Sequence, residues 1–541
     1  MRYSLLIQPA KIIMTLCFLS TFAATSYAQT VPDAGRILQD TMPDRNYQPR
    51  EMSPNMNLQG APLTERESGG SEVRISKVNF NGNTIYDDSV LKEQILTYLG
   101  QDLDMAELQD ISNRISRFYR ENGYVFAQAV LPRQDLSDNT LEVSIIEGHF
   151  GSITASGKSS TLNQQAQSFL ASLRPGDVIM GEKLERTALL MEDLPGINIV
   201  PVMRPGDAPG TGDLDVHIEP TKRFKGQVGL DNHGSRSSGE NRTTVGIQAN
   251  RLFTLGDELS LTALYSEEDL WLGRLAYSFP LGTEGWRAQL SYARTEYDLR
   301  DPFTGLTGTA DVTRAEVSYP FIRSQRTNIA VSAAYEYTEL NDRFEGTSYQ
   351  QRNGHSLPLA LQFDHRDSIG AGGVTFGEAR INSGEINHNQ NGSVDGGYTK
   401  ANLWLSRIQN LGNAFSLLAH GNVQWADTSL DSSEMTSLGG PRDVRAYPSG
   451  AVNASRAWLA QLELRYQASA SAAPYIFYDQ GARLSFENEK HTEIAGGGIG
   501  MRYAAGSWSA DAAVAFQTTG ETLSSEEQKD PRFWFSASYA F

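Results

Sequence analysis

Apolar and polar residues alternate along the chain from residue 224 to the C-terminus, and helical periodicity is absent there. In one such segment Trp271, Gly273, Leu275, Tyr277 and Phe279 occupy every second position. A period of two indicates a β-strand with one face against an apolar medium. About sixteen segments of about ten residues each repeat this pattern, and that is the length a tilted strand needs to cross a bilayer.

The connections between these segments alternate between short turns and long polar loops. The short turns are residues 281–285, 324–326, 410–413 and 505–507, and the long loops are residues 299–310, 341–353, 387–397, 427–454 and 518–530. Outer-membrane barrels have short periplasmic turns and longer outer loops, and an even strand number leaves both barrel ends in the periplasm. The charged run 364–367 is interpreted as another periplasmic turn. A soluble β-sandwich requires neither this alternation nor aromatic residues at strand ends, so we predict a sixteen-stranded transmembrane antiparallel β-barrel over residues 221–541.

Residues 73–148 and 149–220 each have the order strand, helix, helix, strand, strand. In the first copy Leu108, Ile111, Ile115 and Tyr119 lie at helical spacing, which is explained by core packing. The same order over about 75 residues twice in succession predicts two copies of one small α+β module.

Residues 1–28 have the pattern of a cleavable secretory signal. Arg2 and Lys11 supply positive charge, an apolar run follows, and Ser26 and Ala28 are the small residues before the predicted cleavage site. A buried N-terminal helix is the alternative. Cys17 is the only cysteine in the sequence, so the mature chain would contain no disulfide.

Residues 29–72 are polar and rich in proline. Asp33 can cap a short helix that contains Ile37 and Leu38. The rest of this region predicts an extended linker.

The composition argues against several functions. The net charge is −18, and it becomes more negative once Arg2 and Lys11 leave with the signal, so no basic footprint for nucleic acid is present. The eight histidines are scattered, without an H-E-x-x-H pair, and neither a nucleophile elbow nor a complete phosphate loop occurs. We therefore predict no enzyme activity, no cofactor and no metal site. The run 496–498 of three glycines predicts room for a close neighbour inside the barrel.

The longest predicted loop, residues 427–454, contains Val444, Arg445 and Tyr447. On a later strand Phe477, Asp479 and Gly481 share one face. If Ile476 and Tyr478 face lipid, Asp479 points into the lumen, where a carboxylate needs a cationic partner. Arg445 is the candidate partner, and the alternative is that Arg445 is a solvated loop charge.

The chain ends on an alternating strand, with Phe533, Phe535, Tyr539 and Phe541 on one face. A terminal Phe in this position resembles the recognition signal for bacterial barrel assembly. A plain hydrophobic last strand would explain the alternation, but it would not explain why Phe541 coincides with the chain end.

These motifs together resemble the transporter component of two-partner secretion (TpsB type), the haemolysin secretion/activation protein family within the superfamily of barrels that carry POTRA modules. The features that match are the two modules, the sixteen strands, the V-R-G-Y-like motif at residues 444–447, the F-x-D-x-G motif at 477–481 and the segment that begins at Pro32-Asp33. Ala446 stands where the family usually has Gly, and Ala would be strained there if the position needs a positive φ.

The resemblance implies the fold and the mechanism. Residues 29–72 would hold a pore-plugging helix with Asp33, Ile37 and Leu38, residues 73–148 and 149–220 would be POTRA domains in the periplasm, and the barrel would sit in outer-membrane lipid after insertion by the barrel assembly machinery. The POTRA domains would bind an unfolded exoprotein of the TpsA type by strand addition. The exoprotein, for example a haemolysin, adhesin or contact-dependent toxin, would thread through the pore without ATP.

Two other functions remain open from the sequence. One is a barrel assembly factor of the same superfamily, which usually carries more POTRA modules. The other is a passive sixteen-stranded porin, which would need neither residues 73–220 nor an inward Arg–Asp pair.

Overall fold

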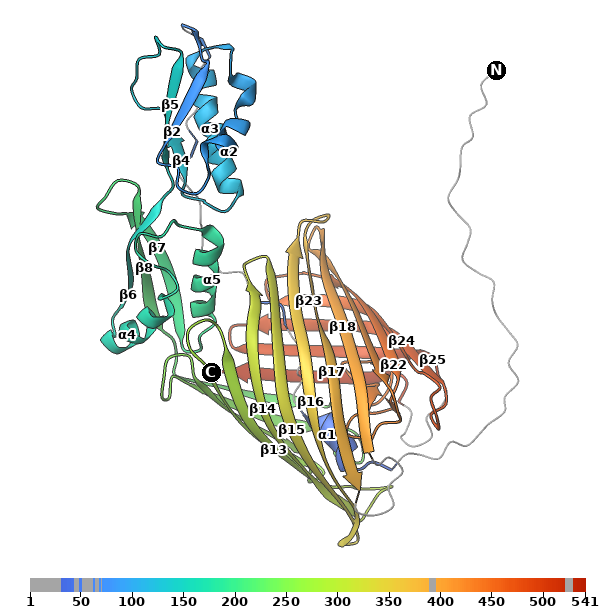
Figure 1. Ribbon diagram of the computed structural model, residues 1–541. Helices are drawn as coiled ribbons and strands as arrows, with labels where there is room; N and C mark the ends of the chain where they lie inside the picture. Colours follow the sequence, from blue (N-terminus) through green and yellow to red (C-terminus); the bar gives the residue numbers. More distant parts are fainter. Residues whose placement is uncertain are drawn as a thin grey trace, which may run out of the picture.

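The computed structural model describes residues 31–42, 48–50, 62–63, 68–69, 71–388, 396–520 and 529–541. The predicted signal, residues 1–28, lies outside these ranges, as does most of the predicted linker. Figure 1 shows a large β-barrel, two small modules in a row at one end of it, and a short helix, α1, inside the barrel near its opposite end. Among the described residues, no helix is both long and apolar enough to cross a membrane.

The barrel is closed and antiparallel, and it has the sixteen strands that the sequence predicted. The last strand pairs with the first, with Tyr539 opposite Val228, so the sheet has no free edge. The strands in barrel order are β9 (Phe224–Asp231), β10 (Arg242–Asn250), β11 (Glu258–Ser266), β12 (Trp271–Pro280), β13 (Arg287–Asp298), β14 (Leu306–Arg323), β15 (Thr327–Phe344), β16 (Thr347–Asp367), β17 (Gly373–His388), β18 (Gly396–Gly412), β19 (Phe415–Ala426), β22 (Ala457–Tyr466), β23 (Ala472–Arg483), β24 (Thr492–Ala505), β25 (Trp508–Thr519) and β26 (Arg532–Ala540).

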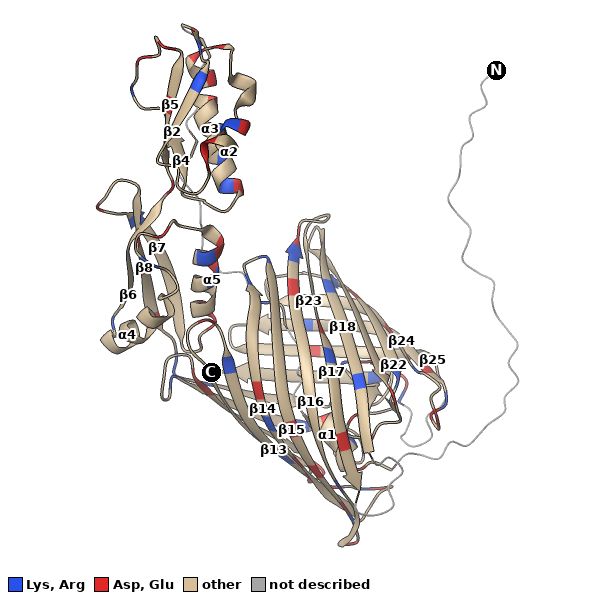
Figure 2. Cartoon of the chain, in the orientation of Figure 1, with Lys and Arg blue, Asp and Glu red and all other residues tan. Residues whose placement is uncertain are grey.

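The two faces of the barrel wall differ in chemistry as the alternation predicts. Apolar side chains such as Leu275, Leu359 and Ile499 are exposed on the outside, where lipid would cover them. Polar side chains such as Arg314 and Glu463 are buried on the inside. Figure 2 shows charged residues at isolated positions along the barrel strands, with most of each strand uncharged.

The predicted long loop at 341–353 is wrong. β15 and β16 continue as paired strands to Phe344 and from Thr347, and only Glu345 and Gly346, both with positive φ, connect them. This is the backbone of a two-residue hairpin turn. The strands are 18 and 21 residues long instead of about ten. A paired strand that extends beyond the bilayer does not need apolar residues. The polar sequence of these strand ends therefore resembles that of a loop.

The charged run 364–367 is also strand and not a turn. Asp364 pairs with Asn328 and His365 with Thr327, so these residues form the last part of β16. Asp364 is buried and accepts a hydrogen bond from the Asn328 side chain at 3.0 Å. The prediction of a turn failed because charged residues at the end of a strand can face the lumen of the barrel and still be part of the strand.

The first module differs from the predicted order in two ways: its first strand is divided into β1 and β2, and a short strand, β3, lies between the helices and pairs with β1. Ile75 pairs through its main chain with Gln101 and Gly100, and this separates β1 from β2. The second helix, α3, begins with a capping box in which Asp104 and Glu107 satisfy each other's main-chain N–H groups. The elements are β1 (Val73–Arg74), β2 (Lys77–Asn81), α2 (Asp88–Glu93), the short 3₁₀ helix η1 (Leu96–Tyr98), β3 (Asp102–Leu103), α3 (Met105–Glu121), β4 (Gln128–Val130) and β5 (Thr140–Ile146).

The second module repeats this topology. Its elements are β6 (His149–Gly157), α4 (Ser160–Phe169), α5 (Gly181–Glu192), β7 (Ile197–Pro205) and β8 (Thr211–Pro220). The sheet orders are β2-β5-β4 and β6-β8-β7, so in both modules the last strand lies in the centre. This central strand runs parallel to β2 or β6 on one side and antiparallel to β4 or β7 on the other.

The second module is fastened to the barrel through α5 and the residue after it, which contact the end of β14 and the turn that follows. Arg186 donates to the carbonyl of Pro320 at 2.8 Å, and Glu185 accepts from the N–H of Gln325 at 2.7 Å. Asp193 accepts two hydrogen bonds from the buried Arg323 guanidinium, at 2.9 and 3.0 Å. These contacts hold the module beside the barrel mouth that faces the periplasm.

Candidate functional site

The loop between β19 and β22 folds into the barrel instead of outward. A short hairpin of β20 (Thr436–Leu438) and β21 (Val452–Ala454) forms its base. Its tip is packed inside the wall, where Val444 and Tyr447 are buried in one apolar cluster with Phe477. The fold therefore brings the motif at residues 444–447 of the loop together with the motif at residues 477–481 of β23, as the sequence predicted.

Arg445 at the tip of this loop is bound to the wall by Asp479. Its guanidinium donates to both carboxylate oxygens of Asp479, at 2.7 and 2.8 Å, and its main-chain N–H donates to the same carboxylate at 3.1 Å. The guanidinium carbon lies 3.5 Å from the centre of the Phe477 ring. Asp479 is fully buried and Arg445 is 6% exposed, so the alternative of a solvated loop charge is wrong. A bidentate pair stacked on an aromatic ring is a strong and directional fastening.

Glu463 completes this charge network, and the sequence analysis missed it. It lies on β22, is 2% exposed, and accepts from Arg445 at 2.9 Å. Arg502 on β24 donates to it at 2.6 Å. The alternation of side chains along β22 could have identified Glu463. Leu462 and Leu464 face lipid, so the residue between them points into the lumen.

Ala446 fits the wall without backbone strain. The φ angle of Ala446 is not positive. The strain that an alanine would have in place of a glycine with positive φ is therefore absent. The constraint is space, because a Cβ built on Gly496 would lie 2.2 Å from the Ala446 Cβ. The predicted role of the glycine run is confirmed at this position, where Gly496 makes room for the loop tip.

Neighbouring residues also position the loop tip. Trp534 donates its ring N–H to the carbonyl of Arg445 at 2.6 Å, and Tyr447 donates its hydroxyl to the carbonyl of Thr519 at 2.9 Å. A Cβ on Gly481 would lie 3.3 Å from Leu438, so Gly481 admits the loop base. The tip thus has contacts on β22, β23, β24, β25 and β26.

Helix α1 (Ala34–Thr41) occupies the lumen beside the loop. Asp33 caps it, as predicted, by accepting from the N–H of Arg36 at 3.0 Å. Ile37 and Leu38 are buried against the inner wall, in a cluster that includes Leu272. The amphipathic helix therefore buries its apolar face inside the barrel.

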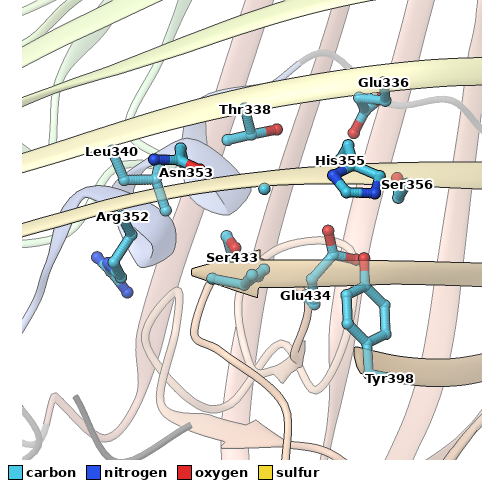
Figure 3. Close-up of a pocket in the computed structure, with 12 residues that line it drawn as sticks. Glu336, Thr338, Leu340, Arg352, Asn353, His355, Ser356, Tyr398, Ser433 and Glu434 are labelled. Carbon is cyan, nitrogen blue, oxygen red and sulfur yellow. The ribbon is translucent and has the colours of Figure 1, made fainter. Parts of the chain in front are cut away.

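Arg352 on β16 joins α1, the loop and the wall at one point. Its guanidinium lies 3.0 Å from the Asp33 carboxylate, 2.9 Å from Asp342 on β15 and 2.7 Å from Asp431 on the loop. Asp342 also accepts the N–H of Ala34 at 2.7 Å, which adds a carboxylate at the positive end of the helix. Figure 3 shows Arg352 close to Ser433 of the loop, and these residues line a small cavity between loop and wall.

The chain from α1 reaches the other end of the barrel at residues 48–50. Arg50 pairs with Asp193, the residue that follows α5, and its carbonyl accepts from Arg366 on β16. Asp193 therefore contacts the barrel through Arg323. It also contacts the segment that follows α1, through Arg50. Neither Arg352 nor Asp193 was identified from the sequence.

Comparison with known proteins defines the family. The model of the haemolysin secretion/activation protein family ShlB/FhaC/HecB matches residues 210–503, more than half of the chain. The chain belongs to this haemolysin secretion/activation family. Residues 73–148 also match the ShlB-type POTRA domain, with the boundaries predicted for the first module. Members of the family are outer-membrane barrels with periplasmic POTRA domains, and this chain has that architecture.

Relatives in this family resemble the chain over most of its length. The heme/hemopexin transporter protein HuxB of Haemophilus influenzae is 26% identical over 487 residues, which are 85% of this chain and 85% of that protein. The outer membrane transporter CdiB of Dickeya dadantii is 23% identical and covers 84% of each chain. The structure of CdiB from Escherichia coli has a TM-score of 0.74 at 18% identity, over 90% of this chain and 94% of that one.

The C-terminal Phe541 lies at the seam where this family member's barrel closes. Its N–H donates to the carbonyl of Gly226 at 2.9 Å, and the N–H of Gly226 donates back at 3.1 Å. The Phe541 side chain is exposed on the outside of the barrel.

Proposed function

We propose that this chain exports a large exoprotein, such as a haemolysin, adhesin or contact-dependent toxin, from the periplasm through its barrel to the cell surface. The relatives include a heme/hemopexin transporter protein and outer membrane transporters. The observation that carries the proposal is the filled lumen. Helix α1 and the loop tip occupy it, and ion pairs rather than continuous strand pairing fasten them to the wall.

Helix α1 is the removable plug in this proposal, with Asp33, Ile37 and Leu38 as its anchoring residues. Its N-terminal end contacts Arg352, the carbonyl of Asp40 near its C-terminal end accepts from Arg242, and its apolar face packs on the wall. A one-helix element of this kind can leave without breaking any strand of the barrel.

The loop tip acts as the fixed partner of the plug. Val444, Arg445 and Tyr447 stay in contact with the wall around Phe477, Asp479 and Gly481. The loop contacts the helix through Ser432, whose hydroxyl donates to the Asp33 carboxylate, and Asp431 of the same loop pairs with Arg352 on the wall. The lock therefore sets the position of the surface on which α1 rests.

The remaining regions have supporting roles. Residues 1–28 direct the chain out of the cytoplasm, Phe541 is read by the barrel assembly machinery, and the POTRA domains bind the unfolded exoprotein by strand addition. Folding of the exoprotein outside the cell supplies the drive for export, so no ATP is required.

The direct experiment deletes the gene in a strain that also encodes an adjacent exoprotein and measures that exoprotein by immunoblot. We expect it to disappear from the culture supernatant and to return when the wild-type gene is supplied on a plasmid. Undiminished export in the deletion strain would refute the proposal. A fall in the amounts of unrelated outer-membrane barrels would instead favour the barrel assembly factor, and loss of small-solute uptake alone would favour the porin.

A further inference from the structure

The inner wall of the barrel beneath α1 is apolar, although the interior of an outer-membrane barrel is ordinarily polar. Helix α1 contacts β13, β14 and β15 near the end of the barrel opposite the POTRA modules (Figure 1). The apolar wall residues that form one buried cluster with the helix are here named the plug seat. They are Leu264, Leu272, Ala293, Ala310, Val312 and Leu340.

The lumen wall changes from charged to apolar along the direction of export. On β14 the inward-facing Arg314 pairs with Glu336 of β15 at 3.0 Å. Val312 is the next inward-facing residue of β14 toward the outer end, and Leu340 lies beyond Glu336 on β15 in the same direction. A chain that moves outward along this wall therefore passes the charged residues first and the plug seat afterwards.

The charged wall residues that contact α1 keep other partners when the helix leaves. Arg352 retains Asp342 at 2.9 Å and Asp431 at 2.7 Å. Arg242, which donates to a carbonyl near the other end of α1, retains Asp231 at 2.8 Å. Departure of α1 therefore exposes mainly the apolar surface of the plug seat, and contact of this surface with water is unfavourable.

The contacts of α1 show which side chains fit this site. Ile37 and Leu38 are buried on the plug seat. On the loop side of the helix, a Cβ built on Gly35 would lie 2.3 Å from the Ser432 hydroxyl oxygen and 2.6 Å from the main-chain nitrogen of Ser433. The space between wall and loop therefore accepts aliphatic side chains on the wall side and only a small residue on the loop side.

We propose that the plug seat binds aliphatic segments of the exported chain once α1 has left, an inference that rests on the proposed export function. A pair such as Ile-Leu, with a small residue nearby, takes the place of Ile37 and Leu38 and covers the apolar wall. Segments without aliphatic residues pass without binding. Because the plug seat lies near the outer end of the lumen, each bound segment slows the return of the chain toward the periplasm while the part ahead of it folds outside.

The test uses the full-length transporter and an exoprotein that is held in the barrel by a stably folded domain fused to its C-terminus. The segment held in the lumen is a Gly-Ser stretch with one cysteine beside either an Ile-Leu or a Ser-Ser pair. The transporter carries Val312→Cys in the plug seat or the control Gln362→Cys, because Gln362 on β16 has its side chain in a polar contact with Glu378 at 2.8 Å. Cys17 lies in the predicted signal, so each introduced cysteine is the only one in the mature chain.

With Val312→Cys, the yield of disulfide should be about tenfold higher for the Ile-Leu segment than for the Ser-Ser segment, because burial of aliphatic side chains holds the first segment on the wall. With Gln362→Cys, the two segments should give equal yields. Equal yields with Val312→Cys, or disulfides with Gln362→Cys alone, would overturn the inference and leave the export function standing. Absence of disulfides with both variants would mean that the exoprotein does not enter the barrel, and the proposed export function would then fail as well.

Conductance of the transporter lacking residues 29–45 gives a readout that does not depend on export. In planar bilayers, a short Gly-Ser peptide with one Ile-Leu pair should reduce the conductance, and the same peptide with Ser-Ser should not. Val312→Ser should weaken the block by the Ile-Leu peptide while the conductance without peptide stays that of the plug-deleted transporter, which shows that the barrel is folded. Equal block by both peptides, or block that is unchanged in Val312→Ser, would contradict the inference.

Discussion

Arg445, on a loop inside the barrel, donates from two guanidinium nitrogens to the two carboxylate oxygens of Asp479 on β23. Both residues are buried, and Glu463 is the second carboxylate that Arg445 contacts. Removal of the arginine would leave Asp479 without its main partner. Breaking a buried pair from one side costs about 3–5 kcal/mol, and less where water enters the lumen.

Arg445→Ala should therefore reduce export sharply while the barrel still assembles. Barrel assembly is measured by heat-modifiable mobility on gels, and export by the exoprotein in the supernatant. The matched control is Arg343→Ala, because Arg343 is exposed near the tip of the β15–β16 hairpin. Normal export by both Arg445→Ala and Asp479→Ala would refute the role of the lock.

Gly496→Ala should disturb the loop tip by overpacking. The added Cβ would lie 2.2 Å from the Ala446 Cβ and 2.7 Å from the carbonyl of Phe516. Overpacking of this kind costs about 1–3 kcal/mol. We expect a lower melting temperature of the folded barrel on gels, and partial recovery in the double variant with Ala446→Gly. An unchanged melting temperature would mean that the loop tip does not press on β24.

Ile37→Asp should expel helix α1 from the lumen. Ile37 is 1% exposed and lies in an apolar cluster, so a carboxylate there would be buried without a partner. The variant should show higher single-channel conductance in planar bilayers, as should deletion of residues 29–45. Val31→Asp is the control, because Val31 is exposed. Equal conductance of Ile37→Asp and the wild type would place the plug elsewhere.

Stability of the first POTRA module should fall in acid because of Glu147. Burial raises the pKa of this carboxyl, but hydrogen bonds from Thr84 and Ile85 outweigh burial and hold the pKa below its usual value of 4.5. A depressed pKa contributes stability above the unfolded-state pKa, and this contribution is lost as pH falls through the lower folded-state value.

Urea unfolding of purified residues 73–220, followed by circular dichroism, checks this pH dependence. The wild type should lose stability between pH 5 and pH 3 by more than Glu147→Gln does. The control is Glu121→Gln, at the exposed end of α3. Identical pH profiles of the wild type and Glu147→Gln would show that Glu147 is not the titrating group.

The sequence predicted best those features that depend on local pattern. Asp33 was found as a helix cap because capping needs only neighbouring residues, and Asp479 was placed in the lumen by strand periodicity alone. Arg352 and Glu463 were missed because their roles depend on contacts among several strands, the loop and α1. The β15–β16 hairpin was predicted as a loop because a polar strand beyond the bilayer has no apolar face to reveal it.

The plug can be tested most directly with a reversible crosslink between α1 and the wall. The hydroxyl oxygens of Thr41 and Thr295 lie 3.5 Å apart and both residues are buried, so cysteines at these positions bring two thiols within reach of a disulfide. The single variants Thr41→Cys and Thr295→Cys are the controls.

The decisive measurement is export by the Thr41→Cys/Thr295→Cys double variant under oxidising conditions and again after reduction. If α1 must leave the lumen for export, the exoprotein should be absent from the supernatant when the disulfide is formed. Export should return to the level of the single variants when the disulfide is reduced. Export at the single-variant level with the disulfide intact would contradict the claim that α1 is a plug that moves.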